Sequence, residues 1–446
     1  MPHVGKKTSG DIRLLTVGVC VLSLLMGSVR VASAVADPHE LFPTGAKVES
    51  DNKEQWLSVG MGVRTSFSSQ QNGSANGQNY SNAFGIQNAR LYVNGALNRY
   101  LKFEFNTDCF NCPSGQNGSG TGIGSNAGGN STMGVLDLIG KVEYNQYVNV
   151  WFGRLLVPGE RGELNGPFFH ATYDGFRTPL NSADFSGNTG NGGAGMYGRD
   201  DGAVFWGELN TSTIKQIQYS RGAFKGLRSA GSGCGGPCGP NQANNLLYAG
   251  RLTLNFLNPE KNPGYYTAGT YYGKAGDILA LAGGFNFQAK GAGSFQHPSD
   301  LSIFTSDLLF EKVLPNAGVF TFNAELKRYW ADYNSLAFTD PAASAGNNFG
   351  MFRGTSLTAY ALYLFPDQVG WGKFQPYGRY TYIDPQGSLV RKEYELGLNY
   401  VIKGFNSRVS AFWQYGDINT KSLTNYASSA AGEMVHRFVL AYQFQY

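Results

Sequence analysis

The sequence lacks the usual marks of a membrane helix and of a catalytic site. Beyond residue 36, no apolar run is long enough to cross a bilayer as a helix, and no amphipathic helical pattern of useful length occurs. There is no glycine-rich phosphate loop on a strand–helix unit and no Cys-x-x-Cys-His haem attachment motif. The histidines, His39, His170, His297 and His436, lie outside any recognisable nucleophile motif. We therefore expect no enzyme, no cofactor and no metal site.

The N-terminus has the pattern of a secretory signal peptide. A basic leader precedes an apolar run over residues 14–26, and small-residue patterns then predict cleavage after Ala34 or Ala36. We therefore exclude residues 1–36 from the fold and expect residues 37–55 to form a periplasmic N-terminal segment.

The mature chain carries almost no net charge. The sequence has 35 basic and 31 acidic residues, and four of the basic and one of the acidic residues lie in the leader. The remaining 31 basic and 30 acidic residues give no argument for nucleic acid as a partner. Any charge selectivity must therefore depend on where individual side chains point.

The sequence is rich in glycine and aromatic residues, and apolar and polar residues alternate along many of its segments. With 61 Gly, 26 Tyr and 30 Phe, it is typical of many short strands joined by Gly, Asn and Ser loops. The last ten residues place one aromatic-rich set on one face of a strand: Phe438, Leu440, Tyr442, Phe444 and Tyr446. A strand that closes a barrel in lipid turns such a face outward and its polar face to a wet lumen. A sandwich strand packed on a second sheet is the alternative.

Sixteen segments share this alternation and have the length that a tilted strand needs to cross a bilayer. They are residues 56–67, 87–98, 100–108, 133–144, 147–156, 201–209, 213–221, 246–257, 278–290, 301–313, 317–330, 354–365, 373–383, 392–402, 406–416 and 434–446. The sequence therefore predicts an all-β fold, a transmembrane antiparallel β-barrel over residues 56–446, with eighteen strands as the alternative count.

The connections between these segments alternate between long and short, as in barrels with long extracellular loops and short periplasmic turns. Within residues 258–277, the stretch 265–272 has strand composition, but a strand there would make the count odd. We expect an extended periplasmic turn instead, with its tyrosines at the lower aromatic girdle. Tryptophans are also expected at the girdles: Trp56, Trp151, Trp330, Trp371 and Trp413.

One stretch gives the chain a family resemblance. Residues 153–168, Gly-Arg-Leu-Leu-Val-Pro-Gly-Glu-Arg-Gly-Glu-Leu-Asn-Gly-Pro-Phe, resemble the start of the third loop in the phosphate-selective porin O and P family. Similarity continues at Asn88-Ala89-Arg90-Leu91 and at Arg199-Asp200-Asp201-Gly202, and spans roughly residues 55–446. The resemblance implies a sixteen-stranded, homotrimeric porin of the bacterial outer membrane, surrounded by lipid, with one loop folded inward as a constriction.

The alternation along the strands predicts that a set of basic side chains faces the lumen, and loop 157–200 adds two more basic residues. The candidate pore-lining residues are Arg64, Arg90, Lys102, Lys141, Arg161, Arg177, Arg251, Arg379 and Arg408. Because the first two strands carry arginines with no facing acid of their own, the pattern suggests a basic arc over one wall. Solvated or cross-paired charges of both signs are the alternative.

The longest loop, 157–200, is the candidate constriction, because a barrel of this size leaves an aqueous channel unless a loop narrows it. Its aromatic residues Phe168 and Phe169 would hold it against the wall, while charges face the solute. His170 and Asp174 are the one local pair that a hydrolase could use, and we expect a structural or pore-lining role for them. An external loop packed on its neighbours is the alternative.

Four cysteines follow the leader: Cys109, Cys112, Cys234 and Cys238. Both pairs fall in predicted loops, and an oxidising compartment favours disulfides. We prefer local pairing within each loop among the three connectivities. A four-cysteine zinc site that joins the loops is the alternative.

These observations predict a porin for passive diffusion of small hydrophilic solutes, with a preference for anions or phosphate as the finer expectation. The alternative from another functional class is a structural (scaffold) barrel that surrounds a partner electron carrier.

Overall fold

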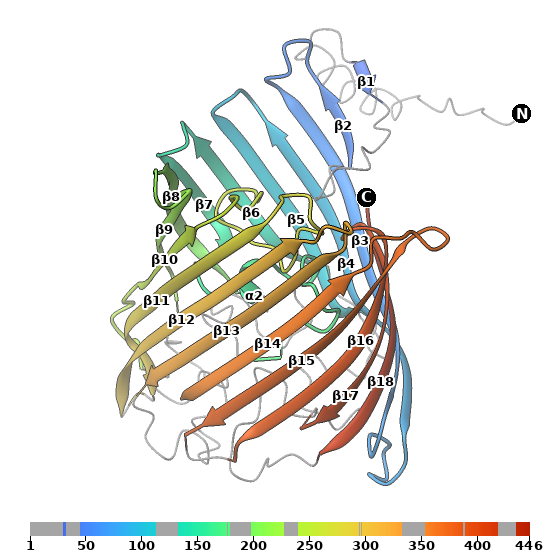
Figure 1. Cartoon of the computed structure of the whole chain (residues 1–446). Helices are drawn as coiled ribbons and strands as arrows, with labels where there is room; N and C mark the ends of the chain where they lie inside the picture. Colours follow the sequence, from blue (N-terminus) through green and yellow to red (C-terminus); the bar gives the residue numbers. More distant parts are fainter. Residues whose placement is uncertain are drawn as a thin grey trace, which may run out of the picture.

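The computed structural model shows a closed antiparallel β-barrel (Figure 1). It describes residues 30–32, 45–112, 133–175, 177–178, 198–226, 240–293, 295, 297–331, 353–386, 389–417 and 434–446. Within these residues sixteen strands, β3 to β18, pair in chain order, and β18 pairs with β3 to close the sheet. The eighteen-strand alternative is thereby excluded for the barrel wall.

The strand bounds follow the predicted segments within a few residues, except that β4 begins earlier. The strands are β3 (Trp56–Gln70), β4 (Ser81–Ala96), β5 (Leu101–Cys112), β6 (Gly134–Glu143), β7 (Asn149–Leu156), β8 (Arg199–Asn210), β9 (Gln216–Phe224), β10 (Leu247–Asn255), β11 (Ile278–Gly293), β12 (Pro298–Val313), β13 (Val319–Ala331), β14 (Gly354–Leu364), β15 (Lys373–Pro385), β16 (Arg391–Lys403), β17 (Ser407–Gly416) and β18 (Val435–Gln445). One short helix, α2 (Arg161–Leu164), lies inside the barrel (Figure 1).

The first and last strands of the barrel, β3 and β18, meet at the closing seam. The N–H of Tyr446 donates to the carbonyl of Met61, and the N–H of Met61 donates back to Tyr446, at 2.8 and 2.9 Å. A Cβ at Gly60 would lie 2.2 Å from the carbonyl oxygen of Tyr446, so only glycine permits this approach. The seam therefore depends on main-chain contacts of the last residue.

The N-terminal segment continues the sheet beyond this seam. β2 (Ala46–Glu49) pairs with the start of β3, and β1 (Arg30–Ala32) pairs with β2. β1 falls within the expected leader, and the cleavage site and the 37–55 boundary remain predictions.

The two faces of the wall have the chemistry that the alternation predicted. Met61 and Leu91 are 47% and 41% exposed on the outside, whereas Arg64 and Arg90 are buried on the inside. Closure satisfies the backbone hydrogen bonds of every strand, which a lipid environment requires. In the described part of the chain, no helix combines the length and the apolarity needed to cross a membrane.

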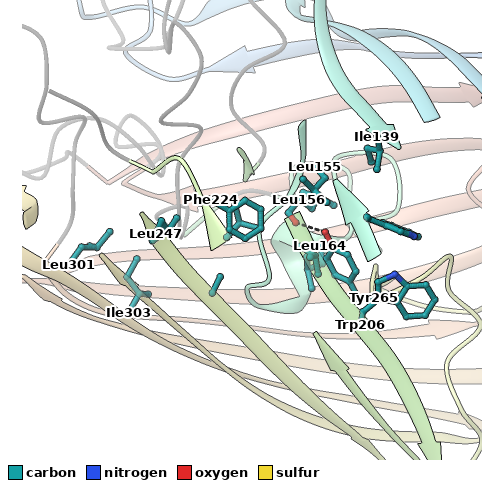
Figure 2. Packing of buried hydrophobic residues seen from close by; sticks show 14 of the residues in the cluster. Ile139, Leu155, Leu156, Leu164, Trp206, Phe224, Leu247, Tyr265, Leu301 and Ile303 are labelled. Carbon is teal, nitrogen blue, oxygen red and sulfur yellow. Dashed lines mark hydrogen bonds between the residues drawn. The ribbon is translucent and has the colours of Figure 1, made fainter. Parts of the chain in front are cut away.

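Two expectations about aromatic residues are wrong. Tyr265 and Tyr271, in the segment between β10 and β11, are 1% and 0% exposed, so they do not face lipid at a girdle. Trp151 is 1% exposed, because Phe152 takes the outward position on β7 and Trp151 points inward. Its ring packs on Tyr265 with centroids 5.4 Å apart, and both residues belong to the buried cluster that Figure 2 shows in part.

Replacement of Leu91 by Arg tests the assignment of the outer face. Near the bilayer midplane this change should lower the free energy of unfolding by roughly 2–4 kcal/mol, because the charge is exposed to lipid. Leu97→Arg, at an exposed rim position after β4, should cost only about 0–1 kcal/mol. Equilibrium unfolding from lipid vesicles measures both, and equal tolerance of the two changes would contradict the assignment.

Candidate functional site

The loop after β7 folds into the lumen. All four residues of α2 are buried, and Phe168 and His170 are 0% and 2% exposed. Gly166 follows the C-cap of α2 with a φ of 59°, the left-handed conformation that ends helices. The described part of loop 157–200 therefore lies inside the barrel, and the external-loop alternative does not hold for it.

A second segment enters the lumen from the opposite end. Residues 258–277 connect β10 to β11 on the side of the short turns, and they meet α2. The Thr267 hydroxyl lies 2.8 Å from the Arg161 carbonyl and 2.6 Å from Oδ1 of Asn165. The N–H of Gly269 donates to the carbonyl of Phe169 at 2.9 Å. We name residues 157–175 the inner loop and residues 258–277 the inner turn.

Arg161 joins these two segments to the wall. Its guanidinium binds both carboxylate oxygens of Glu260 on the inner turn, each at 2.7 Å, and its Nε lies 3.3 Å from Asp307 on β12. Burial alone would lower the pKa of Arg161, but Glu260 and Asp307 raise it well above its usual value. Burial likewise opposes ionisation of Glu260, yet Arg161 holds its pKa below the usual range. Both groups therefore stay charged.

Lys327 on β13 provides a second anchor for α2. Its Nζ lies 2.7 Å from Glu160 and 3.0 Å from Glu163, and all three side chains are at most 2% exposed. Gly162 faces the same wall, and a Cβ there would meet Oε2 of Glu325 at 2.4 Å. With glycine at that position, no side chain of α2 displaces the Glu325 carboxylate from the space between the helix and β13.

The far end of the inner loop is bound through its backbone. Three wall arginines, Arg64, Arg379 and Arg408, donate to main-chain carbonyls of residues 170–174, and Arg408 alone donates to two of them, at 3.0 and 2.9 Å. These arginines belong to the predicted lining, and the structure uses them to hold the loop.

Loop charges also bind acids of the wall. Arg177 contacts both carboxylate oxygens of Glu393 on β16 through its Nε, at 3.0 and 2.9 Å. Asp174 lies 3.3 Å from Arg437 on β18 and 3.4 Å from Arg177. The loop is therefore cross-linked to the wall by charges of both signs.

The aromatic residues of the loop also hold it to the wall. Phe168 lies under the guanidinium of Arg90, 4.9 Å from its ring centroid, and Phe169 packs edge-on against Phe405 at 5.5 Å. These contacts agree with the sequence-based expectation that aromatics would seat the loop.

The wall of β4 to β6 pairs its charges across strands. Arg90 has an acid opposite it, because register places Asp108 of β5 beside it at 2.6 Å. Lys141 pairs with Glu104 at 2.5 Å, and Lys102 pairs with Glu143. Arg251 of β10 pairs with Asp307.

Each of the nine predicted lining residues thus points into the barrel and contacts an acidic or carbonyl oxygen. The described lumen therefore has cross-paired charges rather than the basic arc that the first two strands suggested.

Burial and neighbouring cations keep His170 neutral. Its burial, followed by the charges of Arg64, Arg379 and Arg408, lowers its pKa to about 3. A Cβ at Gly175 would lie 2.3 Å from the His170 ring, so the loop folds tightly around it. The arrangement is that of a packed structural residue.

The cysteine placement differs from the expectation. Cys109 and Cys112 lie in β5 rather than in a loop, and Cys109 is disulfide-bonded. Three strand steps separate their Cα atoms by roughly 10 Å, beyond the about 7 Å that a disulfide spans. A local bond would require the end of β5 to leave the extended conformation. Cys234 and Cys238 lie outside the described residues, so the pairing remains a prediction.

The sequence analysis did not identify four residues of the site, namely Glu160, Glu260, Thr267 and Lys327. Their roles depend on the entry of the inner turn into the lumen, which no local pattern shows. Among the described side chains, no group of three or more His, Cys, Asp and Glu is arranged to hold a metal ion.

No family model and no curated protein matches the chain. Similar solved structures include an anion-selective porin from Comamonas acidovorans, at 13% identity and a TM-score of 0.52, covering 88% of this chain and 100% of that one. OmpF of Salmonella typhi has 10% identity and a TM-score of 0.53, with coverage of 89% and 100%. OprB of Pseudomonas putida has 9% identity and a TM-score of 0.50, with coverage of 87% and 94%.

At these identities the likeness establishes the fold, a sixteen-stranded barrel. That fold and the apolar exterior together place the chain in a bacterial outer membrane.

Acidification should loosen the inner loop in the membrane-embedded protein. The usual pKa of His lies near 6.5, and that of folded His170 lies at about 3. The closed loop therefore binds fewer protons than an open one between these values, and its stability falls as the pH falls. Hydrogen exchange of residues 160–175 at pH 7 and pH 4, corrected for intrinsic rates, measures this change.

His170→Asn should remove most of this pH dependence, whereas His297→Asn, at an exposed histidine, should leave it intact. Equal protection of the loop at both pH values in the unmodified protein would show that His170 does not control it.

Proposed function

We propose that the chain is a porin, in which small hydrophilic solutes diffuse passively through a lumen narrowed by the inner loop and the inner turn. The observation that carries this proposal is the meeting of two segments from opposite ends inside a closed barrel, joined by Arg161 and Glu260. A sixteen-stranded barrel without such segments would leave a wide aqueous channel. Together they supply the narrowing that a selective pore requires.

The exposure of lumenal charges supports a solute path along β5 and β6. The side chains of Lys102 and Glu143 are 32% and 20% exposed, whereas those of Arg161 and Glu260 are 0% and 5% exposed. Lys141 and Glu104 are intermediate, at 10% and 15%. Water therefore reaches the β5–β6 wall more readily than the junction of the two inner segments.

The solute preference belongs to the same proposal. Arg64, Arg379, Arg408 and Arg437 form a basic group near the inner loop, and the resemblance to phosphate-selective porins adds support for anions. Glu393 and Glu395 lie among these arginines and offset their charge. Because a pore selects by the net field at its narrowest section, we propose weak anion preference rather than strict phosphate selectivity.

The assembly is proposed as a homotrimer embedded in outer-membrane lipid, without a cofactor and without catalysis. A scaffold barrel would have to admit a carrier protein along its axis. In the described lumen that space holds the inner loop and inner turn, which supports the channel over the scaffold.

Conductance of the purified mature protein in a planar bilayer tests the function. We expect stepwise channels with a reversal potential that indicates weak anion preference, and at most partial reduction of the current by phosphate. Glu260→Gln should raise the single-channel conductance, because Arg161 then loses its charged partner on the inner turn.

Glu54→Gln, at an exposed turn before β3, is the matched control and should leave the conductance unchanged. A folded protein that stays silent in the bilayer, with and without Glu260→Gln, would refute the porin. Channels whose conductance is unchanged by Glu260→Gln would instead refute the proposal that the inner turn narrows the lumen.

A further inference from the structure

Arg221 occupies an unusual position on the outer face of the barrel. Along β9, Gln218 and Ser220 are buried on the lumenal side, whereas Arg221 is exposed on the opposite side. Register places it between Phe205 of β8 and Gly250 of β10. Among the described residues, no acid or hydrogen-bond acceptor pairs with its guanidinium. A cation on a lipid-facing wall is costly unless an anionic group reaches it.

The surroundings of Arg221 are apolar, and the position beside it on β10 is a glycine. Phe205, Tyr248 and Leu252 are 41%, 53% and 46% exposed on the same face. At Gly250 an added Cβ would meet only the carbonyl oxygen of Ser220, at 3.6 Å, so the surface beside Arg221 is open. This surface offers contact for an acyl chain next to a cationic group.

More positive charge lies toward the end of the barrel that carries the long loops. Lys225 follows Arg221 by four residues, or roughly 13 Å along the strand, and Arg154 lies on β7, on the other side of β8. Both contact Asp201, at 3.8 and 3.6 Å, and the Asp201 side chain is 52% exposed. Among the described residues, one acid thus contacts two cations, and Arg221 adds a third positive charge to this face.

We propose that Arg221, Lys225 and Arg154 form a binding site for the phosphate of an anionic lipid in the outer leaflet. The lipid's acyl chain would lie on the apolar surface beside Gly250. Arginine and lysine near a headgroup layer attract anionic lipid, and an arginine below that layer can extend toward it. A second copy of the chain would have to present an outward acid to Arg221, and Asp201, the acid that the described part of this surface carries, already contacts two cations.

This inference rests on the placement of the barrel in a membrane and does not depend on conduction. Failure of the lipid experiment would leave the porin proposal intact, and a silent channel would leave the lipid site intact.

Native mass spectrometry of the purified protein tests the site, with bis-phosphorylated lipid A and with phosphatidylcholine as probes. We expect retained lipid A and no comparable retention of phosphatidylcholine. Arg221→Gln should lower the affinity for lipid A by about fivefold, the effect of one cation near a headgroup layer. Lys312→Gln is the matched control. Lys312 is an exposed outward lysine that pairs with Asp277, and it lies on β12 at the end of the barrel with the short turns, away from Arg221. This variant should leave lipid A binding unchanged.

Three results would overturn the proposal. Equal loss of lipid A in both variants would mean a nonspecific charge effect. Displacement of lipid A by equimolar inorganic phosphate would identify a site for free phosphate. A change of oligomeric state in Arg221→Gln without a change in lipid A binding would assign the surface to a second copy of the chain.

Discussion

The interior of this barrel depends on one buried group of charges, formed by Arg161, Glu260 and Asp307. It joins a loop from one end of the barrel, a turn from the other end and the wall of β12. Removing charges from water is expensive, and their attraction offsets that cost only when the geometry is good and the remaining donors are satisfied. Arg161 uses its two terminal nitrogens for two oxygens of Glu260 and the carbonyl of Ala268, while its Nε has only an ion-pair contact with Asp307, at 3.3 Å. Loss of one partner would leave a buried charge and release both segments.

The rest of the lumen follows the same physical rule. A barrel wall turns many polar residues inward, so any segment that enters must satisfy polar groups as well as bury its own apolar side chains. The inner loop does so with its backbone, whose carbonyls accept hydrogen bonds from Arg64, Arg379 and Arg408. The inner turn does so at Glu311, which accepts from the N–H groups of Tyr271 and Gly273. Phe169 of the inner loop also packs against the buried cluster that contains Tyr271 of the inner turn.

Much of the wall could be predicted because strand alternation is local. The sixteen segments, the closing strand with its outward Leu440 and Tyr442, and the inward aim of Arg64 and Arg90 all follow from a period of two. The partner of Arg90 could not be predicted in the same way. It is Asp108 on the next strand, and a bulge near Asn106 in the neighbouring pairing shows that register there depends on tertiary structure.

The entry of the inner turn into the lumen could not be predicted from the sequence for a related reason. Its tyrosines have strand and girdle composition, and only the folded barrel shows that Tyr265 and Tyr271 are buried against the inner loop. Trp151 was predicted at the girdle because tryptophan is common at membrane interfaces. On β7, however, Phe152 faces outward, so the adjacent Trp151 faces the lumen.

A cross-link between the two inner segments tests the central claim most directly. The side chains of Asn165 and Thr267 are in contact at 2.6 Å, so the pair Asn165→Cys and Thr267→Cys should form a reducible bond in the membrane-embedded protein. The control pair Asn165→Cys and Glu54→Cys should not. Absence of the first bond under conditions that oxidise accessible thiols would mean that the inner turn does not meet the inner loop, and the account of the narrowed lumen would fail.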